Sequence, residues 1–163
     1  MLDAVFTARG SYSAENCSVK RALDVVGEKW TLLVLREAFY GARRFEQFQA
    51  HVGCARNLLS ERLNTLVDAG VMRRVPYREA GQRERHEYRL TDKGLDLLPA
   101  VIALMEWGDR WAADPDGAPV EITHRDCGHR VELALRCTND GTALTPRDLQ
   151  PRPGPGARPS ESA

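Results

Sequence analysis

The spacing of apolar residues changes at Gly70, and this change limits the folds open to the chain more than any other feature. Between Leu59 and Leu66, leucines recur every three or four residues, which is the spacing of one helix face. Residues 71–75 and 87–90 instead alternate as strands do, and a polar bend separates them. The pattern therefore predicts a helix that ends at Gly70, followed by two antiparallel strands joined by a loop.

Three more helices are expected ahead of this point. Residues 18–26 have a helical spacing that ends at Gly27, and residues 43–52 show a short amphipathic pattern. Residues 29–40 are apolar nearly all round, so the helix that they form should lie at the centre of a core. Gly41 is expected to end that helix.

One long helix is expected after the two strands. Thr91 precedes it as an N-cap, and Asp92 adds a favourable negative charge to its first turn. From Leu97 to Trp111 this helix carries a broad apolar face. The predicted fold class is therefore mainly α with a small two-stranded β-ribbon, which places it in the α+β class.

Chain length and local composition predict one ordered domain with extensions. At 163 residues the chain is long enough to bury a core. Residues 1–16 mix small and polar types and are expected to be a flexible arm, whereas residues 17–113 should form the ordered domain. Residues 114–145 contain short strand-like runs and should form a small C-terminal extension. Residues 146–163 are Pro-rich and cannot bury enough apolar surface, so they are expected to be disordered.

The formal net charge is zero, so charge alone does not identify a partner. Its distribution is uneven, however: residues 41–93 hold 11 Arg or Lys against 7 Asp or Glu, whereas acidic residues prevail after Gly94. A positive face is therefore expected on a neutral protein. No apolar run approaches the ~18 residues of a membrane span, and the first residues lack the pattern of a secretory signal. We therefore expect a cytoplasmic protein without a membrane partner.

The helix that ends at Gly70 has an outer face of short polar side chains. Such a face is commonly just solvated, but Asn and Arg side chains also suit the base edges in the DNA major groove. The context favours DNA, because a short helix, a turn and this helix, followed by a basic ribbon, form the layout of a winged helix-turn-helix. In that layout the second helix enters the major groove, and the ribbon, called the wing, touches the flanking backbone.

The residues predicted to contact double-stranded DNA fall into three groups. Two lie at the start of the helix before the turn and suit contacts with phosphates: Arg43 and Arg44. The recognition helix supplies Arg56, Asn57, Ser60, Glu61, Arg62 and Asn64. The wing supplies Arg78, Arg83 and Arg85. For the wing arginines the alternative is a merely solvated hairpin, and Glu61 either pairs with a cytosine amino group or does not touch DNA.

Four motifs give the chain a family resemblance. They are Cys-x-Val at residues 17–19, Gly-x-Lys-Trp at 27–30, Leu-x-x-Arg-Leu-x-x-Leu-x-x-x-Gly at 59–70 and Glu-Tyr-x-Leu-Thr-x-x-Gly at 87–94. With them, residues 17–113 resemble the HxlR-type family of bacterial winged-helix transcriptional regulators. The resemblance implies a homodimer that binds a two-fold symmetric operator and dimerises through its first and last helices.

The start of the recognition helix departs from the family pattern. Relatives usually place a Ser or Thr cap there, often followed by Pro, whereas this chain has Ala55 and Arg56. Loss of a cap typically costs ~1 kcal/mol of helix stability. Arg56 could offset this cost by binding a phosphate, in which case the helix start would become ordered on DNA.

Cys17 and Cys54 each precede a predicted helix. The resemblance aligns Cys17 with a near-terminal cysteine that is a redox sensor in some family members. Its place before a helix, next to Lys20 and Arg21, would favour the thiolate that oxidant sensing requires, and oxidation would then shift the dimer and its DNA affinity. The alternative for Cys17 is a small buried residue at the dimer interface. Cys54 is expected to be a packed turn residue.

The remaining two cysteines raise the question of a metal. His124-x-x-Cys127 and Cys137-x-x-Asp140 have the spacing of an altered zinc ribbon, with His129 beside the first pair. Zinc sites of this kind favour sulfur and imidazole over a carboxylate. A small metal-free hairpin is therefore the favoured interpretation, and no cofactor is expected.

Three other functions are conceivable. An enzyme is disfavoured because the chain contains no Gly-rich phosphate loop, nucleophile elbow or His-Glu-x-x-His motif. A winged-helix module that binds a protein instead of DNA fits the low charge of the recognition helix but not the wing arginines. A regulator that responds to a small molecule would use aromatic side chains near the dimer helices, although such side chains are more often core. The candidates are Phe39, Tyr40, Trp107 and Trp111.

Overall fold

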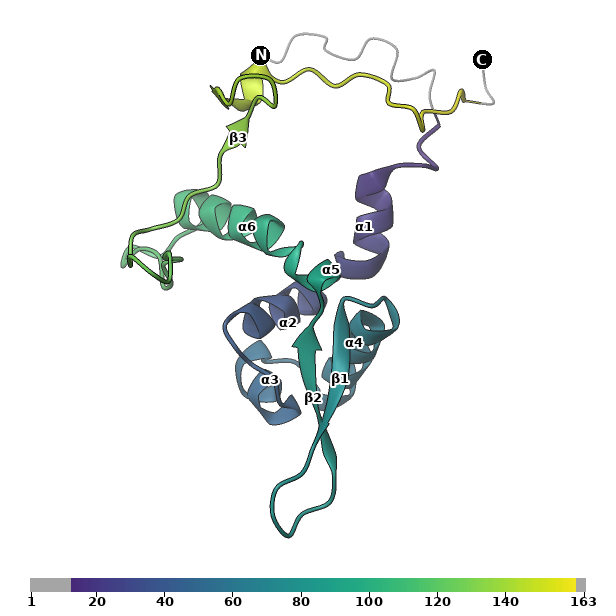
Figure 1. Ribbon diagram of the computed structural model, residues 1–163, viewed down its shortest axis with the longest axis vertical. Coiled ribbons are helices and arrows are strands. Elements are labelled where there is room, and N and C mark those ends of the chain that lie inside the picture. The colour runs from purple at the N-terminus through teal and green to yellow at the C-terminus, as the bar shows by residue number, and fades with distance from the viewer. Residues whose placement is uncertain (1–12, 161–163) are drawn as a thin grey trace. The chain divides into compact units, whose positions relative to one another are not determined.

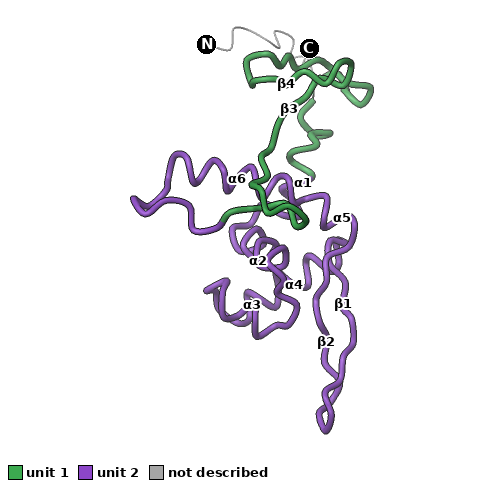
Figure 2. The backbone as a smooth tube through the Cα atoms, turned by 60° about the vertical axis from the view of Figure 1, so that its left-hand side comes forward, with its two compact units in different colours: residues 1–21, 121–163 green, residues 22–120 purple. Residues whose placement is uncertain are grey.

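The computed structural model describes residues 13–160, and its first four helices and the ribbon follow the predicted order (Figure 1). The chain divides into two compact units (Figure 2). Unit 1 comprises residues 1–21 and 121–163, and unit 2 comprises residues 22–120. Most of the arm expected at residues 1–16 lies outside the described residues. None of the helices in the described part of the chain combines the length and the apolar character that a membrane crossing requires.

Four helices precede the ribbon, at the positions that the apolar spacing predicts. They are α1 (Ser18–Val26), α2 (Lys29–Phe39), α3 (Phe45–Val52) and α4 (Arg56–Asp68). Within unit 2, α2 packs against both α3 and α4. Val34, Leu35 and Ala38 of α2 are buried, which confirms that this helix lies at the centre of the core.

Helix α4 buries one face and exposes the other. Its leucines Leu59, Leu63 and Leu66 are fully buried in the core of unit 2. Each buried leucine side chain contributes about 1.5–3 kcal/mol of transfer free energy, so the three together anchor the helix. Because side chains project around a helix at 100° per residue, this anchoring holds the opposite, polar face at the surface.

The predicted ribbon is confirmed as β1 (Met72–Tyr77) and β2 (Arg85–Leu90), which pair antiparallel along their whole length. The backbone N–H of Tyr88 donates to the carbonyl of Arg43 at 2.7 Å, so the segment ahead of α3 is bonded to β2. The ring of Tyr88 also meets the ring of Phe48 edge to face, with centroids 6.3 Å apart. These contacts attach the base of the wing to the helical core.

The prediction of one long helix after the ribbon is wrong. The structure has a short helix α5 (Asp92–Leu95) and, after a break, helix α6 (Leu98–Trp111). The predicted cap is confirmed, because the hydroxyl of Thr91 accepts a hydrogen bond from the N–H of Gly94 at 3.2 Å. Pro99 lies in the first turn of α6, where its missing N–H is harmless. Inside a continuous helix the proline would remove a backbone hydrogen bond and clash with the preceding turn.

Within unit 1, the C-terminal extension forms short elements. Strand β3 (Leu135–Arg136) pairs antiparallel with β4 (Ala143–Leu144), and the 3-10 helix η2 (Pro146–Asp148) follows. Every buried apolar side chain among the described residues lies between Val26 and Ile102, so the described part of the extension has no apolar core of its own. The disorder expected for the Pro-rich tail stays a prediction.

Candidate nucleic-acid interface

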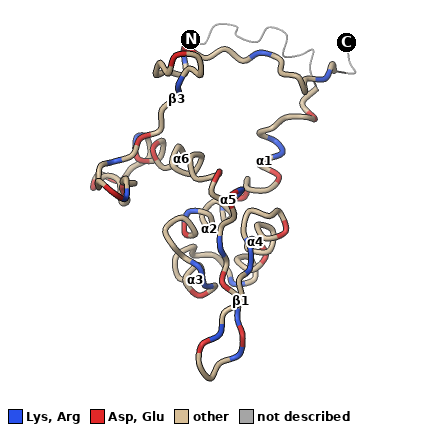
Figure 3. Tube along the Cα trace, in the orientation of Figure 1, with Lys and Arg blue, Asp and Glu red and all other residues tan. Residues whose placement is uncertain are grey.

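The turn between α3 and α4 leaves the polar face of α4 at the surface. Asn57, Glu61 and Asn64 are exposed on this face, and Ser60 is half-buried. These side chains match the outer face that the helical spacing predicts. Along the wing, basic and acidic side chains both occur, so the wing is of mixed charge (Figure 3).

The N-terminus of α4 has no side-chain cap, as the sequence predicts. Ala55 precedes the helix with an extended backbone, and no side chain bonds to the first turn. The first N–H groups are therefore left for an outside acceptor, which is the position that a phosphate occupies at helix N-termini. The guanidinium of Arg56 stands over the ring of Phe45, 4.6 Å from its centroid, so its charge is held beside the helix start.

A surface hollow of about 350 Å³ lies between the start of α4 and the wing. It is lined by Phe45, Glu46, Arg56, Tyr77, Arg83, Arg85, His86 and Tyr88. The three arginines come from segments up to 29 positions apart in sequence, against a single glutamate in the lining. Guanidinium groups bind phosphate oxygens through paired N–H donors, so the chemistry of this hollow suits a phosphate. The sequence indicated each arginine separately but did not show that they share one hollow.

Arg44 is occupied by acidic partners on the wing. Its guanidinium bonds to Glu79 at 2.7 Å and lies 3.7 Å from Glu87, and it also stands over the ring of Tyr77 at 4.5 Å. Glu87 is shared with Arg89 at 2.9 Å. The hydrogen bond from Arg89, aided by the charge of Arg44, holds the pKa of the Glu87 carboxyl below its ordinary value. The sequence did not indicate that Glu79 and Tyr77 would hold Arg44.

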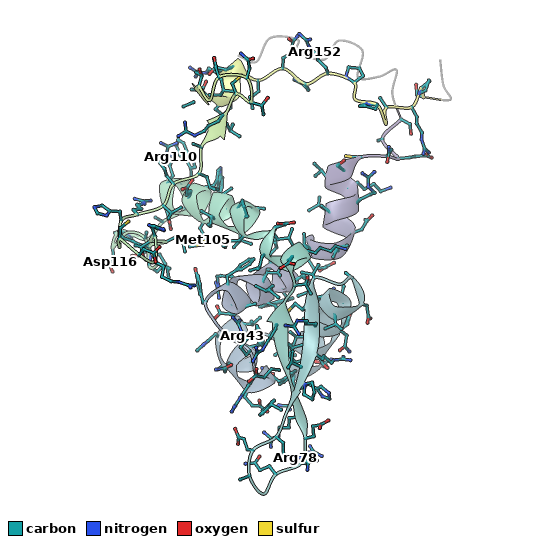
Figure 4. All side chains as sticks on the ribbon, viewed as in Figure 1. Arg43, Arg78, Met105, Arg110, Asp116 and Arg152 are labelled. Atoms are coloured by element: carbon teal, nitrogen blue, oxygen red, sulfur yellow. The ribbon has the colours of Figure 1, made fainter. Side chains whose placement is uncertain are left out.

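Arg43 has a structural contact that its sequence position does not reveal. Its guanidinium donates to the carbonyl of Ala38 at 2.8 Å and to that of Ala42 at 2.9 Å. These carbonyls lie at and beyond the last turn of α2, where helices leave acceptors unsatisfied. Arg43, labelled in Figure 4, therefore caps the C-terminal end of α2 through these two hydrogen bonds.

The side chains of α4 that are predicted to contact bases differ in whether another side chain already binds them. The carboxylate of Glu61 binds the guanidinium of Arg62 at 2.7 Å, and the Arg62 side chain is only 18% exposed. Asn64 accepts a hydrogen bond from Arg74 of β1, so α4 and the wing are linked at this point. The pairing with Arg62 gives Glu61 a role that the sequence left unexplained. Arg74 is a further basic residue at this surface that sequence reasoning missed.

Arg78 lies in the loop of the wing, near its tip (Figure 4). The loop also contains Arg83 and Gly81, and all three residues are exposed. An exposed basic loop on a ribbon matches the predicted placement of these arginines. Whether they contact DNA stays a prediction.

The four cysteines all carry thiols and lie in different settings. Cys17 is half-buried, and its carbonyl accepts the N–H of Arg21 at 3.1 Å, so it lies at the N-terminus of α1. Cys54 is buried against the core of unit 2. The packed turn residue expected at Cys54 is therefore confirmed.

The four potential metal ligands of the extension form two separate pairs. His124 Nδ1 lies 3.1 Å from Cys127 Sγ. The carboxylate of Asp140 accepts the N–H of Thr142 at 2.9 Å. This bond, the side chain of Thr142 and then the Cys137 thiol hold the pKa of the Asp140 carboxyl below its ordinary value. Within residues 13–160, no group of three or more His, Cys, Asp or Glu side chains is close enough to hold a metal ion.

Apolar side chains are exposed on two helices. Val19 and Leu23 of α1 are exposed, and so are Trp107 and Trp111 of α6, at 62% and 70%. Tyr40 is also exposed and donates to the sulfur of Met105 at 3.5 Å, whereas Phe39 packs against the core. Neither the hollow at α4 nor a second one at residues 108–119 is lined by any of the four aromatic residues considered for an effector.

The chain matches known regulators in sequence and in structure. Residues 25–116 match the HxlR-like helix-turn-helix family. The uncharacterized HTH-type transcriptional regulator Rv3095 of Mycobacterium tuberculosis is 49% identical over 146 residues, which cover 90% of this chain and 91% of Rv3095. The crystal structure of PA1607, a candidate transcription factor, has a TM-score of 0.74 at 42% identity and covers 85% of this chain and 95% of PA1607. The redox regulator HypR in its oxidized form has a TM-score of 0.53 at 30% identity, over 58% of this chain and 96% of HypR.

These findings agree with the geometry of unit 2. The family match spans 92 of the 163 residues and contains α2 to α6 with the wing. Its members and the relatives named above are transcriptional regulators, so the enzyme considered as a rival is excluded. The chain belongs to the HxlR-like helix-turn-helix family of transcriptional regulators, and its fold is a winged helix-turn-helix.

Proposed function

We propose that the chain acts as a homodimer that binds a two-fold symmetric DNA operator, with α4 in the major groove and the wing on the flanking backbone. The hollow at the start of α4 carries this proposal, because it gathers Arg56, Arg83 and Arg85 beside an uncapped helix end. Helix N–H groups and guanidinium groups are the donors that hold phosphates in protein–DNA complexes. One backbone phosphate in the hollow sets the register of α4 in the groove.

The exposed face of α4 supplies the choice of sequence. Asn57, Ser60 and Asn64 bear amide or hydroxyl groups, which match the donor and acceptor patterns of base edges. Arg62 is turned toward Glu61, so this pair acts as one unit and opens only if a base competes for the guanidinium. Phosphates on the flanking backbone compete in the same way for Arg43 and Arg44, and the exposed Arg78 in the loop of the wing binds a further phosphate.

The homodimer rests on the exposed apolar faces of α1 and α6. Leu23 on α1, and Leu104, Trp107 and Trp111 on α6, are more than half exposed in the single chain. Large apolar side chains grouped on a surface helix mark interaction sites. A second copy of the chain presents the same faces, so a symmetric dimer can bury them.

Oxidation of Cys17 is the proposed control of DNA affinity. Cys17 is half-buried at the N-terminus of α1, and the helix dipole favours a thiolate there. Because α1 belongs to the proposed dimer interface, a modified Cys17 would shift the two α4 helices relative to each other. The likeness to a redox regulator, HypR, supports this form of control.

Binding to DNA is tested by fluorescence anisotropy with two duplexes, one from the region upstream of the chain's own gene and one of scrambled sequence. We expect tighter binding to the first duplex, with a log–log salt slope of about −0.9 per phosphate contact. Arg56→Ala and Arg85→Ala should each reduce the slope by about 1 on both duplexes. Asn64→Ala should instead mainly reduce the preference for the upstream duplex over the scrambled one.

Arg152→Ala, in the C-terminal segment, is the control for these variants. Equal affinity for the two duplexes at every salt concentration would favour the protein-interaction module.

Redox control is tested with the same upstream duplex before and after hydrogen peroxide, and again after dithiothreitol. The parent should lose or gain affinity reversibly, and Cys17→Ser should respond to neither reagent. If Cys17→Ser responds as the parent does, Cys17 is not the sensor, and a regulator that responds to a small molecule becomes the better proposal.

A further inference from the structure

Two hairpins in the C-terminal extension share one backbone design. In the first hairpin, the N–H of His124 donates to the carbonyl of His129 at 2.8 Å. In the second hairpin, the N–H of Cys137 donates to the carbonyl of Thr142 at 2.9 Å. The two bonds span the same number of residues and start 13 positions apart. The strand pairs that flank them, Thr123 with Arg130 and Arg136 with Ala143, keep the same offset.

Each hairpin also closes its turn in the same way. The N–H of Gly128 donates to the carbonyl of His124 at 2.8 Å, and the N–H of Gly141 donates to that of Cys137 at 2.9 Å. The two glycines have φ of 70° and 75°, a left-handed conformation that other residues rarely adopt. The turns His-Arg-Asp-Cys-Gly and Cys-Thr-Asn-Asp-Gly are therefore equivalent, position by position.

Both turns place a metal-binding side chain at their first and fourth positions. His124 and Cys127 supply an imidazole and a thiol, with Nδ1 and Sγ 3.1 Å apart. Cys137 and Asp140 supply a thiol and a carboxylate that interact through a hydrogen bond. The 3.1 Å between Nδ1 and Sγ resembles the separation of neighbouring ligands around one tetrahedral ion, whose bonds are about 2.0–2.3 Å long. Two donors on each of two equivalent tight turns make up the four that such an ion requires.

The hairpins have no apolar interior that would explain their design. Leu133 and Leu135 are exposed, and every buried apolar side chain of the described chain belongs to unit 2. Small segments that cannot form a sufficient core commonly depend on a structural metal for stability. Equivalent turns without a core are therefore better explained by a shared ligand than by packing.

We propose that the two hairpins together bind one divalent ion of the zinc type, through His124, Cys127, Cys137 and Asp140. In the described residues the two donor pairs stand apart, so the ion draws the hairpins together. Cys127 and Cys137 are 10 positions apart, which limits their separation to about 35 Å even in a fully extended chain. A tether this short keeps one pair at a high effective concentration near the other.

The donor set defines the class of ion. Two thiols lose their protons to solvent on binding, while the imidazole binds in its neutral form and the carboxylate as the anion. Two sulfurs, one nitrogen and one oxygen suit Zn²⁺ and Co²⁺, whereas Mg²⁺ and Ca²⁺ prefer oxygen donors alone. The ion is structural in this proposal, because all four positions of a tetrahedron are filled by protein.

Co²⁺ is the probe that tests the site, because its absorption reports thiolate coordination and tetrahedral geometry. The full-length chain, treated with chelator and kept reduced, is titrated with CoCl₂. We expect thiolate-to-cobalt charge-transfer absorption that saturates at one Co²⁺ per chain and disappears when Zn²⁺ is added. Absence of this absorption, or saturation at a ratio other than one, would overturn the proposal.

Variants then identify the ligands. Cys127→Ala and Cys137→Ala should each weaken Co²⁺ binding by more than the 10–100-fold typical of residues outside the first ligand shell. Asp140→Cys should tighten binding and strengthen the charge-transfer band, because it replaces a carboxylate by a thiolate. His129→Ala and Cys17→Ser are the controls and should bind as the parent does. Circular dichroism of the helices in unit 2 shows that each variant is folded. Equal loss in His129→Ala would remove the assignment to His124.

Discussion

Identical side chains in the candidate interface have different roles, and their partners decide which role each takes. Arg43 donates to two backbone carbonyls, and Arg44 is held by a glutamate 35 positions away. Arg56 instead stands over an aromatic ring in a hollow that it shares with wing residues. Only the last of these guanidinium groups lies in a pocket suited to a phosphate. Ala55 and Glu79 each provide a test at this scale.

Ala55→Ser should stabilise the chain by about 0.5–2 kcal/mol, because a serine hydroxyl can accept an N–H of the first turn of α4. The free energy of unfolding is measured by urea denaturation followed by circular dichroism. Ala50→Ser, inside α3 and exposed, is the control and should be neutral or slightly destabilising. Equal stability of Ala55→Ser and its parent would show that the helix start gains nothing from a cap.

Glu79→Gln should increase DNA affinity, because it releases Arg44 from its nearest carboxylate. The salt slope should steepen by up to about 1, whereas stability should change by less than about 1 kcal/mol since the pair is exposed. Glu84→Gln removes the same charge from the same loop and controls for reduced repulsion alone. Adding Arg44→Ala should abolish the gain. A gain that is as large in Glu84→Gln would mean that Arg44 is not involved.

At the scale of elements, local signals decide where helices and strands begin and end. Gly70 separates α4 from the ribbon, and Thr91 caps α5 as its residue type predicts. The break between α5 and α6 was also encoded locally, in Pro99, but the run of apolar residues around it favoured one long helix. Where a proline and an apolar spacing predict different helix boundaries, the proline decides, because it lacks the N–H that a helix interior needs.

Gly94→Ala should destabilise the chain by about 1–3 kcal/mol. An added Cβ would lie 2.3 Å from the carbonyl oxygen of Val71, so the junction between the ribbon and α5 would have to shift. Gly108→Ala, in helix α6, has no atom within 4 Å of the added Cβ and should stabilise the chain by up to about 1 kcal/mol. Thermal unfolding of both variants checks the contrast. Similar effects of the two substitutions would contradict the close packing at Gly94.

The wing should lose stability in acid through Glu87. Its folded pKa is lowered below the ordinary value of 4.5, so its ionised form stabilises the folded state at higher pH. This contribution is complete above pH 4.5 and is lost as the pH falls through the lower folded pKa. Melting temperatures are compared at pH 7 and across that acidic window. Glu87→Gln should show a weaker acid dependence than the parent and than Glu84→Gln, and an unchanged dependence would exclude Glu87 as a cause.

At the scale of the whole molecule, the apolar core and the exposed apolar faces serve different purposes. Unit 2 contains the buried core and the elements proposed to contact DNA, whereas the described part of unit 1 contains the paired hairpins. The side chains exposed on α6 include two of the three tryptophans of the chain. Such a surface supports the proposed homodimer, because exposed groups of large apolar side chains commonly mark interaction sites.

Trp107→Glu should weaken the dimer by at least about 2 kcal/mol, or about 30-fold. Trp107 is exposed in the single chain and becomes buried in the proposed dimer, where tryptophans commonly contribute much of the binding energy. Sedimentation equilibrium measures the dissociation constant. Leu149→Glu, an exposed apolar residue of unit 1, is the control and should leave it unchanged. If the parent is a monomer at all concentrations, the homodimer proposal fails.

The sequence by itself determined the order of the first four helices and the ribbon, the buried face of α4, the uncapped helix start and the cap at Thr91. These features depend on neighbours within a few positions, so apolar period and residue type are enough to predict them. Only the tertiary structure decided that Arg56, Arg83 and Arg85 share one hollow, that Arg44 is held by Glu79, and that two C-terminal turns are equivalent. Side chains up to 35 positions apart meet only where the packed core and the ribbon bring their backbones together, and no local pattern specifies that approach.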